Sequence, residues 1–207
     1  MQARRFLLAG LASSLAFVTP LLRATTVEPP SFDNLVSRSD YVVRAVVRSA
    51  TPEWKTADGK PYISTRFELD LREVVKGIPP SPLTLDLLGG KIGEVEFKVS
   101  GMPSLEVGDD CILFVYGAEK KLYPLVAMMH GVYPILREAK TGTAYVLRAN
   151  GMPLYATADV SLPMDRPSAA LKQSAVTSVR PLTPAAFIQQ IRQRANRVQS
   201  NKTAHAN

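Results

Sequence analysis

The amino-acid sequence predicts a mainly β fold, a small barrel or sandwich of about seven short strands, preceded by a short helix and followed by an amphipathic helix. Two observations lead to this prediction. Apolar and polar residues alternate in several short stretches, and turn-forming Gly, Pro, Asn or Asp residues separate them. No segment long enough to form a crossover helix lies between successive stretches, which disfavours a parallel α/β sheet.

The first elements are a short helix and a strand. Ser31 is a suitable N-cap for a helix whose apolar side contains Leu35 and Val36. Residues 41–48 then alternate, with apolar side chains on one face and arginines on the other, which predicts a strand. Residues 51–62 contain two prolines and an Asp-Gly pair, so we expect a loop there.

The clearest strand covers residues 66–72, where Phe67, Leu69 and Leu71 face one way and charged residues face the other. The alternation shifts at residues 73–75, which predicts a β-bulge or a bend. Further strands are expected at 83–87, 94–99, 111–116, 122–129, 132–136 and 143–147. The run 111–116 is apolar on both faces, so it is expected to be a central strand.

The chain divides into five predicted segments. These are a signal peptide (1–24), a β-barrel domain (25–149), a Pro-rich and partly disordered linker (150–181), a C-terminal helix (182–199) and a disordered tail (200–207). Thr183 is a good N-cap for the C-terminal helix, and Pro184 is tolerated at its first position.

The first segment has the three-part layout of a secretory signal peptide. Arg4 and Arg5 form a basic start, residues 6–22 are mostly apolar, and the chain becomes polar after Ala24. An uncleaved membrane anchor is the alternative, but the apolar run is short for one and contains Pro20. We therefore expect cleavage near Ala24 and an exported protein, periplasmic or secreted.

Positive charge is concentrated outside the predicted β domain. The chain has a formal net charge of +7, yet all 18 acidic residues lie between Glu28 and Asp165. The basic residues of the tail from Pro167 to Asn207 are Lys172, Arg180, Arg192, Arg194, Arg197 and Lys202. Nucleic-acid binders interleave basic and aromatic residues, and this tail has only Phe187, so no nucleic-acid partner is expected. Membrane contact is expected only through the signal peptide or, weakly, through this tail.

The usual catalytic constellations are missing from the sequence. Its only histidines are His130 and His205, and no GxSxG, HExxH or CxxC motif occurs. We therefore expect neither an enzyme nor a cofactor, although an unrecognised active site is the alternative.

The stretch MMHG raises the alternative of a soft-metal site. Met128, Met129, His130 and Cys111 are the residue types that Cu(I) prefers. In a strand, however, Met128 and His130 share one face while Met129 points the other way, so the three cannot converge on one ion. The favoured interpretation is a core strand that ends at a turn histidine, with Cys111 as a small apolar residue.

Four stretches resemble a family of exported bacterial proteins of unknown function: DNLVSRSDYVVRAVV, TRFELDLREVVKG, LTLDLLGGKIGEVEFKVSGMPSLEVGDDCILFVY and LYPLVAMMHGVYPI. The resemblance covers residues 32–136. The strand order is also similar to the OB-type barrel of netrin-like domains, which include the tissue inhibitors of metalloproteinases. Those inhibitors use an N-terminal Cys and disulfides. Here the mature chain would begin at Thr25, and Cys111 is the only Cys, so the resemblance implies an OB-like barrel without that mechanism.

The sequence therefore predicts an exported, non-catalytic barrel that binds a protein or envelope partner. Its candidate binding residues lie in loops expected at one end of the barrel: Trp54, Met102 with Pro103, and the Gly89-Gly90 turn. Trp54 is the only Trp, and exposed Trp residues often anchor interfaces. The alternatives are a netrin-like inhibitor of a secreted protease and a periplasmic soft-metal binding protein.

Overall fold

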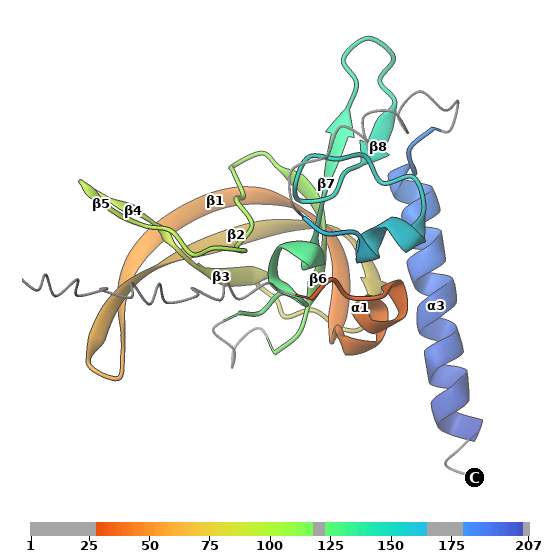
Figure 1. Ribbon diagram of the computed structural model, residues 1–207, viewed down its shortest axis with the longest axis horizontal. Coiled ribbons are helices and arrows are strands. Elements are labelled where there is room, and N and C mark those ends of the chain that lie inside the picture. The colour runs from red at the N-terminus through yellow and green to blue at the C-terminus, as the bar shows by residue number, and fades with distance from the viewer. Residues whose placement is uncertain (1–27, 118–122, 165–179, 205–207) are drawn as a thin grey trace, which may run out of the picture.

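The computed structural model describes residues 28–117, 123–164 and 180–204, and it is mainly β (Figure 1). Six strands form an antiparallel sheet in the order β3-β2-β1-β6-β7-β8, and β4 pairs with β5 in a second, smaller sheet. The strands are β1 (Tyr41–Ala57), β2 (Lys60–Lys76), β3 (Thr84–Leu88), β4 (Gly90–Ile92), β5 (Val95–Phe97), β6 (Asp110–Val115), β7 (Val132–Arg137) and β8 (Ala144–Val146). The helical segments are α1 (Phe32–Arg38), η1 (Met128–Gly131), η2 (Thr157–Ser161) and α3 (Pro184–Ala204).

The predicted mainly β class, with a helix before and after the strands, is confirmed. Within the described ranges the large sheet has β3 and β8 as its two edges, so these pairings form an open sheet rather than a closed barrel. The predicted signal peptide with its cleavage near Ala24 lies outside the described residues. In the part of the chain that the structure covers, no helix is both long and apolar enough to cross a membrane.

Beta-bulges bend the long hairpin of β1 and β2, which curves through the molecule in Figure 1. The predicted irregularity at 73–75 is confirmed, because Val42 pairs with Lys76 while Val43 pairs with Val74, which leaves Val75 between them without a partner. A second shift follows between Arg44 and Ala45. Leu71, predicted to share a face with Phe67 and Leu69, is 44% exposed next to this second shift.

The predicted loop over residues 51–62 is wrong. Strand β1 continues to Ala57 and β2 begins at Lys60, so only Asp58 and Gly59 form the turn. Both have positive φ, 49° and 73°, as the favoured two-residue hairpin turns require. The prolines that suggested a loop pair within the ladder as Pro52 with Thr65 and Pro61 with Thr56.

Two further predictions need correction. Gly89-Gly90 is not the hairpin turn, because the Gly89 N–H still donates to the Ile63 carbonyl (2.9 Å) and Gly90 begins β4. The turn between β4 and β5 lies at residues 93–94. Residues 123–129 do not form the expected strand either: Ala127 has a positive φ of 52°, and the chain enters η1 at Met128.

The large sheet buries apolar side chains on both of its faces. The helix-side core contains Leu35, Val36, Val42, Val75, Ile112, Phe114, Val126, Tyr133, Val146, Leu154, Val160, Phe187, Ile188, Ile191 and Ala195. The hairpin-side core contains Tyr41, Val43, Ala45, Val47, Phe67, Leu69, Leu83, Leu85, Leu87, Leu105, Cys111, Leu113, Val115, Leu125 and Val132. Strand β6 contributes alternate residues to the two cores and pairs with β1 and β7, so it is the predicted central strand.

Helix α3 covers the helix-side core, with α1 beside it (Figure 1). The Thr183 hydroxyl accepts a hydrogen bond from the Ala186 N–H (3.2 Å), which confirms the predicted N-cap, and the helix continues to Ala204, past the predicted end at residue 199. The first part of the predicted linker packs on the domain, because Leu154 and Val160 are fully buried. The rest of that linker, residues 165–179, lies outside the described chain.

Candidate binding groove

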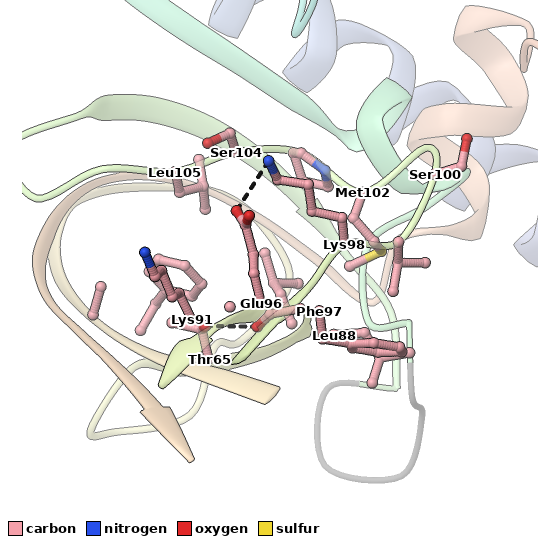
Figure 2. Close-up of a pocket in the computed structure, with 17 residues that line it drawn as sticks. Thr65, Leu88, Lys91, Glu96, Phe97, Lys98, Ser100, Met102, Ser104 and Leu105 are labelled. Atoms are coloured by element: carbon pink, nitrogen blue, oxygen red, sulfur yellow. Dashed lines mark hydrogen bonds and ion pairs between the residues drawn. The ribbon is translucent and has the colours of Figure 1, made fainter. Parts of the chain in front are cut away.

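A groove of about 700 Å³ opens between the β4–β5 hairpin, the large sheet and the segment 98–105 (Figure 2). Phe67 and Leu87 come from the sheet, and Phe97, Met102 and Leu105 come from the two walls. Its lining is therefore mostly apolar. A groove with these properties has the size and composition of a site for a small ligand or for a few side chains of a partner.

Close packing at the end of β3 holds the hairpin against the sheet. Gly90 has a φ of +142°, and a Cβ added to it would come within 2.5 Å of Thr65 Oγ1. Thr65 Oγ1 in turn donates to the Gly89 carbonyl at 2.7 Å. A Cβ at residue 90 would overlap side chains of β1 and β2, so the close approach of β4 to the large sheet favours glycine at this position.

The opposite wall is fixed by backbone hydrogen bonds. The Met102 N–H donates to the Val99 carbonyl (3.2 Å), and the Gly101 carbonyl accepts from the Met129 N–H (3.1 Å). The first bond closes a turn within segment 98–105, and the second ties the segment to η1. Met102 also packs against the hairpin-side core, which orients its half-buried thioether toward the groove.

Three charged side chains line the groove. Glu96 and Lys98 form an ion pair at 2.9 Å, drawn as a dashed line in Figure 2. Lys91, across the hairpin from Glu96, has no ion pair among the described residues. The groove therefore combines an apolar lining with one surplus positive charge.

The structure brings together most of the candidate binding residues. Gly89, Gly90, Met102 and Pro103 line the same groove. Trp54 does not line it: this residue lies on β1 opposite Ile63, and 52% of its surface is exposed. Phe67 and Phe97 were expected only as ordinary strand residues. The available signal was that both belong to stretches in which apolar and charged residues alternate.

The soft-metal ligand set does not come together. Cys111 belongs to the hairpin-side core, whereas His130 hydrogen-bonds to the backbone of Val160, a member of the helix-side core. Burial, with the nearby Asp109 and Asp110, raises the pKa of the Cys111 thiol to about 12, so it stays protonated near neutral pH. The described residues contain no group of three or more His, Cys, Asp or Glu side chains that could hold a metal ion.

A buried polar cluster lies at the start of β7. Continued by two residues beyond the pair Ile135 and Val146, the β7–β8 register brings Tyr133 near Arg148, which is 2% exposed. Arg148 Nη2 donates to the carbonyls of Leu162 and Pro163, the latter at 3.0 Å. Within the described chain, the Tyr133 hydroxyl, His130 Nδ1 and Arg148 Nε are buried without a hydrogen-bond partner. From the sequence, His130 was interpreted as a turn histidine, with a soft-metal ligand as the alternative, and Arg148 was not singled out.

Because of this cluster, we expect the stability of the fold to depend on pH. Burial lowers the pKa of His130 below its ordinary value of 6.5; the hydrogen bond to Val160 opposes this shift, and Arg148 adds to it. The unfolded chain then binds a proton that the folded chain excludes, so stability is full above about pH 6.5 and falls on acidification below it.

The melting temperature between pH 7 and pH 5 tests this expectation. We expect it to fall for the wild type and for His205→Gln, and to fall less for His130→Gln, which cannot titrate at that position. An equal fall in all three proteins would show that His130 is not the group responsible.

No family model matches the chain, and neither a curated protein nor a solved structure is significantly similar to it.

Proposed function

We propose that the chain is an exported, non-catalytic β protein that binds a protein or envelope partner in the groove between the β4–β5 hairpin and segment 98–105. One observation carries this proposal: the Gly89-Gly90 pair and Met102, which are separated in the sequence, line one apolar groove of about 700 Å³. The export part rests on the basic start and the apolar run within residues 1–24 and on the polar residues that follow Ala24.

Exposed apolar side chains beside the groove add support. Val95 is 50% exposed and Phe97 is 39% exposed. The charged Glu96 and Lys98 alternate with them along the chain, and Lys91 lies on the neighbouring strand β4. Apolar surface surrounded by polar side chains is typical of protein interaction sites.

The test is a pull-down from envelope extract, followed by affinity measurements with the purified partner. Met102→Asp places a charge in the apolar groove, and we expect it to weaken binding by about 30-fold, the loss that corresponds to a hot-spot residue of about 2 kcal/mol. Ile78→Asp is the matched control, because Ile78 is 92% exposed and does not line the groove.

Equal affinities of Met102→Asp and the wild type would exclude the groove as the binding site. A secreted protease among the partners would support the inhibitor alternative. The export part is tested separately by the N-terminal sequence of protein recovered from the producing cell, which we expect to begin near Thr25.

A further inference from the structure

We propose that the partner binds at this groove through an extended peptide segment. This segment adds to β5 as a further strand and brings an acidic group to Lys91. This inference rests on the proposed function and names the kind of partner that the groove would hold.

The first observation is the position of β5. In the small sheet of the described chain, β5 pairs only with β4, as Gly90 with Phe97, Lys91 with Glu96 and Ile92 with Val95. A strand at the edge of a sheet presents backbone N–H and C=O groups that can pair with another chain. Such β-strand addition is a common way to bind extended peptides.

The turn between β4 and β5 shows which groups face outward. Residues 93–94 form a two-residue turn, so Ile92 and Val95 are the hydrogen-bonded pair that closes it. Hydrogen-bonded and non-hydrogen-bonded pairs alternate in an antiparallel hairpin, which makes Lys91 and Glu96 a non-hydrogen-bonded pair. The N–H and C=O of Glu96 therefore point away from β4, toward an incoming strand.

The second observation is that apolar side chains flank Glu96 along this edge. Val95 and Phe97, on either side of Glu96, are 50% and 39% exposed. Charged residues discourage strand pairing, but the one charge of β5, Glu96, is paired with Lys98. Here the apolar side chains of β5 leave an edge that a strand with apolar side chains at alternate positions would cover.

The third observation is charge. Lys98 is neutralised by Glu96 at 2.9 Å, which leaves Lys91 as the surplus charge of the groove lining within the described residues. An acidic side chain or a terminal carboxylate of the peptide would complement it. Because Lys91 is exposed, this pair would select the partner more than it would strengthen binding.

A display library of random-sequence peptides, selected on the immobilised full chain, tests the inference. We expect the enriched peptides to alternate apolar and polar residues and to carry Asp or Glu. Selection on Lys91→Glu should enrich Lys or Arg instead. Glu96→Pro removes the outward N–H, and we expect it to weaken binding of the selected peptides about tenfold, the equivalent of one backbone hydrogen bond.

Glu96→Gln is the matched control, because it removes the carboxylate and keeps the N–H; it should bind the peptides nearly as well as the wild type. The backbone amide signals of Gly90 and Phe97 show whether the hairpin stays folded in Glu96→Pro. Selected peptides that lack acidic residues, or no enriched peptide at all, would overturn the inference.

Equal binding of the peptides to Glu96→Pro and to the wild type would also overturn it, and Met102→Asp then separates the two proposals. If Met102→Asp still weakens binding, the groove remains the site and only strand addition fails. If neither variant changes binding, the proposed function of the groove fails as well.

Discussion

Replacement of Phe187 by alanine is expected to lower the free energy of unfolding by about 3–5 kcal/mol. Phe187 is fully buried, and its ring centroid lies 5.0 Å from that of Tyr133, 6.0 Å from that of Phe32 and 6.2 Å from that of Phe114. The ring thus joins α3 to both β6 and β7 and to the N-terminal helix. Its removal leaves a cavity in the helix-side core and takes away aromatic contacts.

Chemical denaturation of wild type, Phe187→Ala and Phe97→Ala measures this effect. Phe97→Ala deletes the same ring from a position that is 39% exposed, so we expect it to cost much less stability, although it removes part of the groove wall. Hydrogen exchange should show faster opening of α3 in Phe187→Ala. A similar cost for the two substitutions would contradict the central place of Phe187 in the core.

Gly77→Ala is expected to destabilise the fold by about 3 kcal/mol, from a strained backbone and a steric overlap. Gly77 has a φ of +71°, and a Cβ there would lie 2.1 Å from the carbonyl oxygen of Asp40. Asp40 cannot easily move aside. Its N–H donates to the Val115 carbonyl at 2.8 Å, and its carboxylate accepts from the Gly117 N–H at 2.6 Å.

Gly142→Ala separates the two causes. Gly142 has a similar φ of +69°, but a Cβ there would meet nothing within 4 Å. We expect this control to cost only the backbone term, about 1 kcal/mol. Denaturant unfolding of both variants gives the comparison, and equal losses would show that the Asp40 overlap is relieved by movement of the chain.

Local patterns in the sequence predicted the elements that depend on local physics. The side-chain hydroxyls of Ser31 and Thr183 cap their helices as expected, at 3.1 Å and 3.2 Å from the N–H groups they accept. The two-sided apolar run of β6 predicted its central place in the sheet. These features are set by residues close together in the sequence, so the sequence alone could indicate them.

Predictions failed where distant pairing overrides local preference. The Pro-containing stretch 51–62 suggested a loop, yet the long ladder between β1 and β2 keeps it extended. The positive φ of Ala127 and Met128 ends the strand expected there, and neither residue type signals such a backbone.

The groove was predicted only in part for the same reason. Gly89, Gly90 and Met102 were identified because turn residues and exposed Met suggest loops. Their meeting with Phe67 depends on how β4 and β5 fold back over the large sheet, which no local pattern shows. Trp54 was selected for its chemistry, but its place on β1 leaves it outside the lining.

The position of α3 has a consequence for folding during synthesis. A ribosome delivers strands β1 to β8 before it delivers Phe187 and Ile191, which complete the helix-side core. Until then, the face of β6 that carries Ile112 and Phe114 lacks its cover and exposes apolar side chains. We therefore expect the nascent chain to stay open to chaperone binding until α3 has emerged, rather than to fold strand by strand.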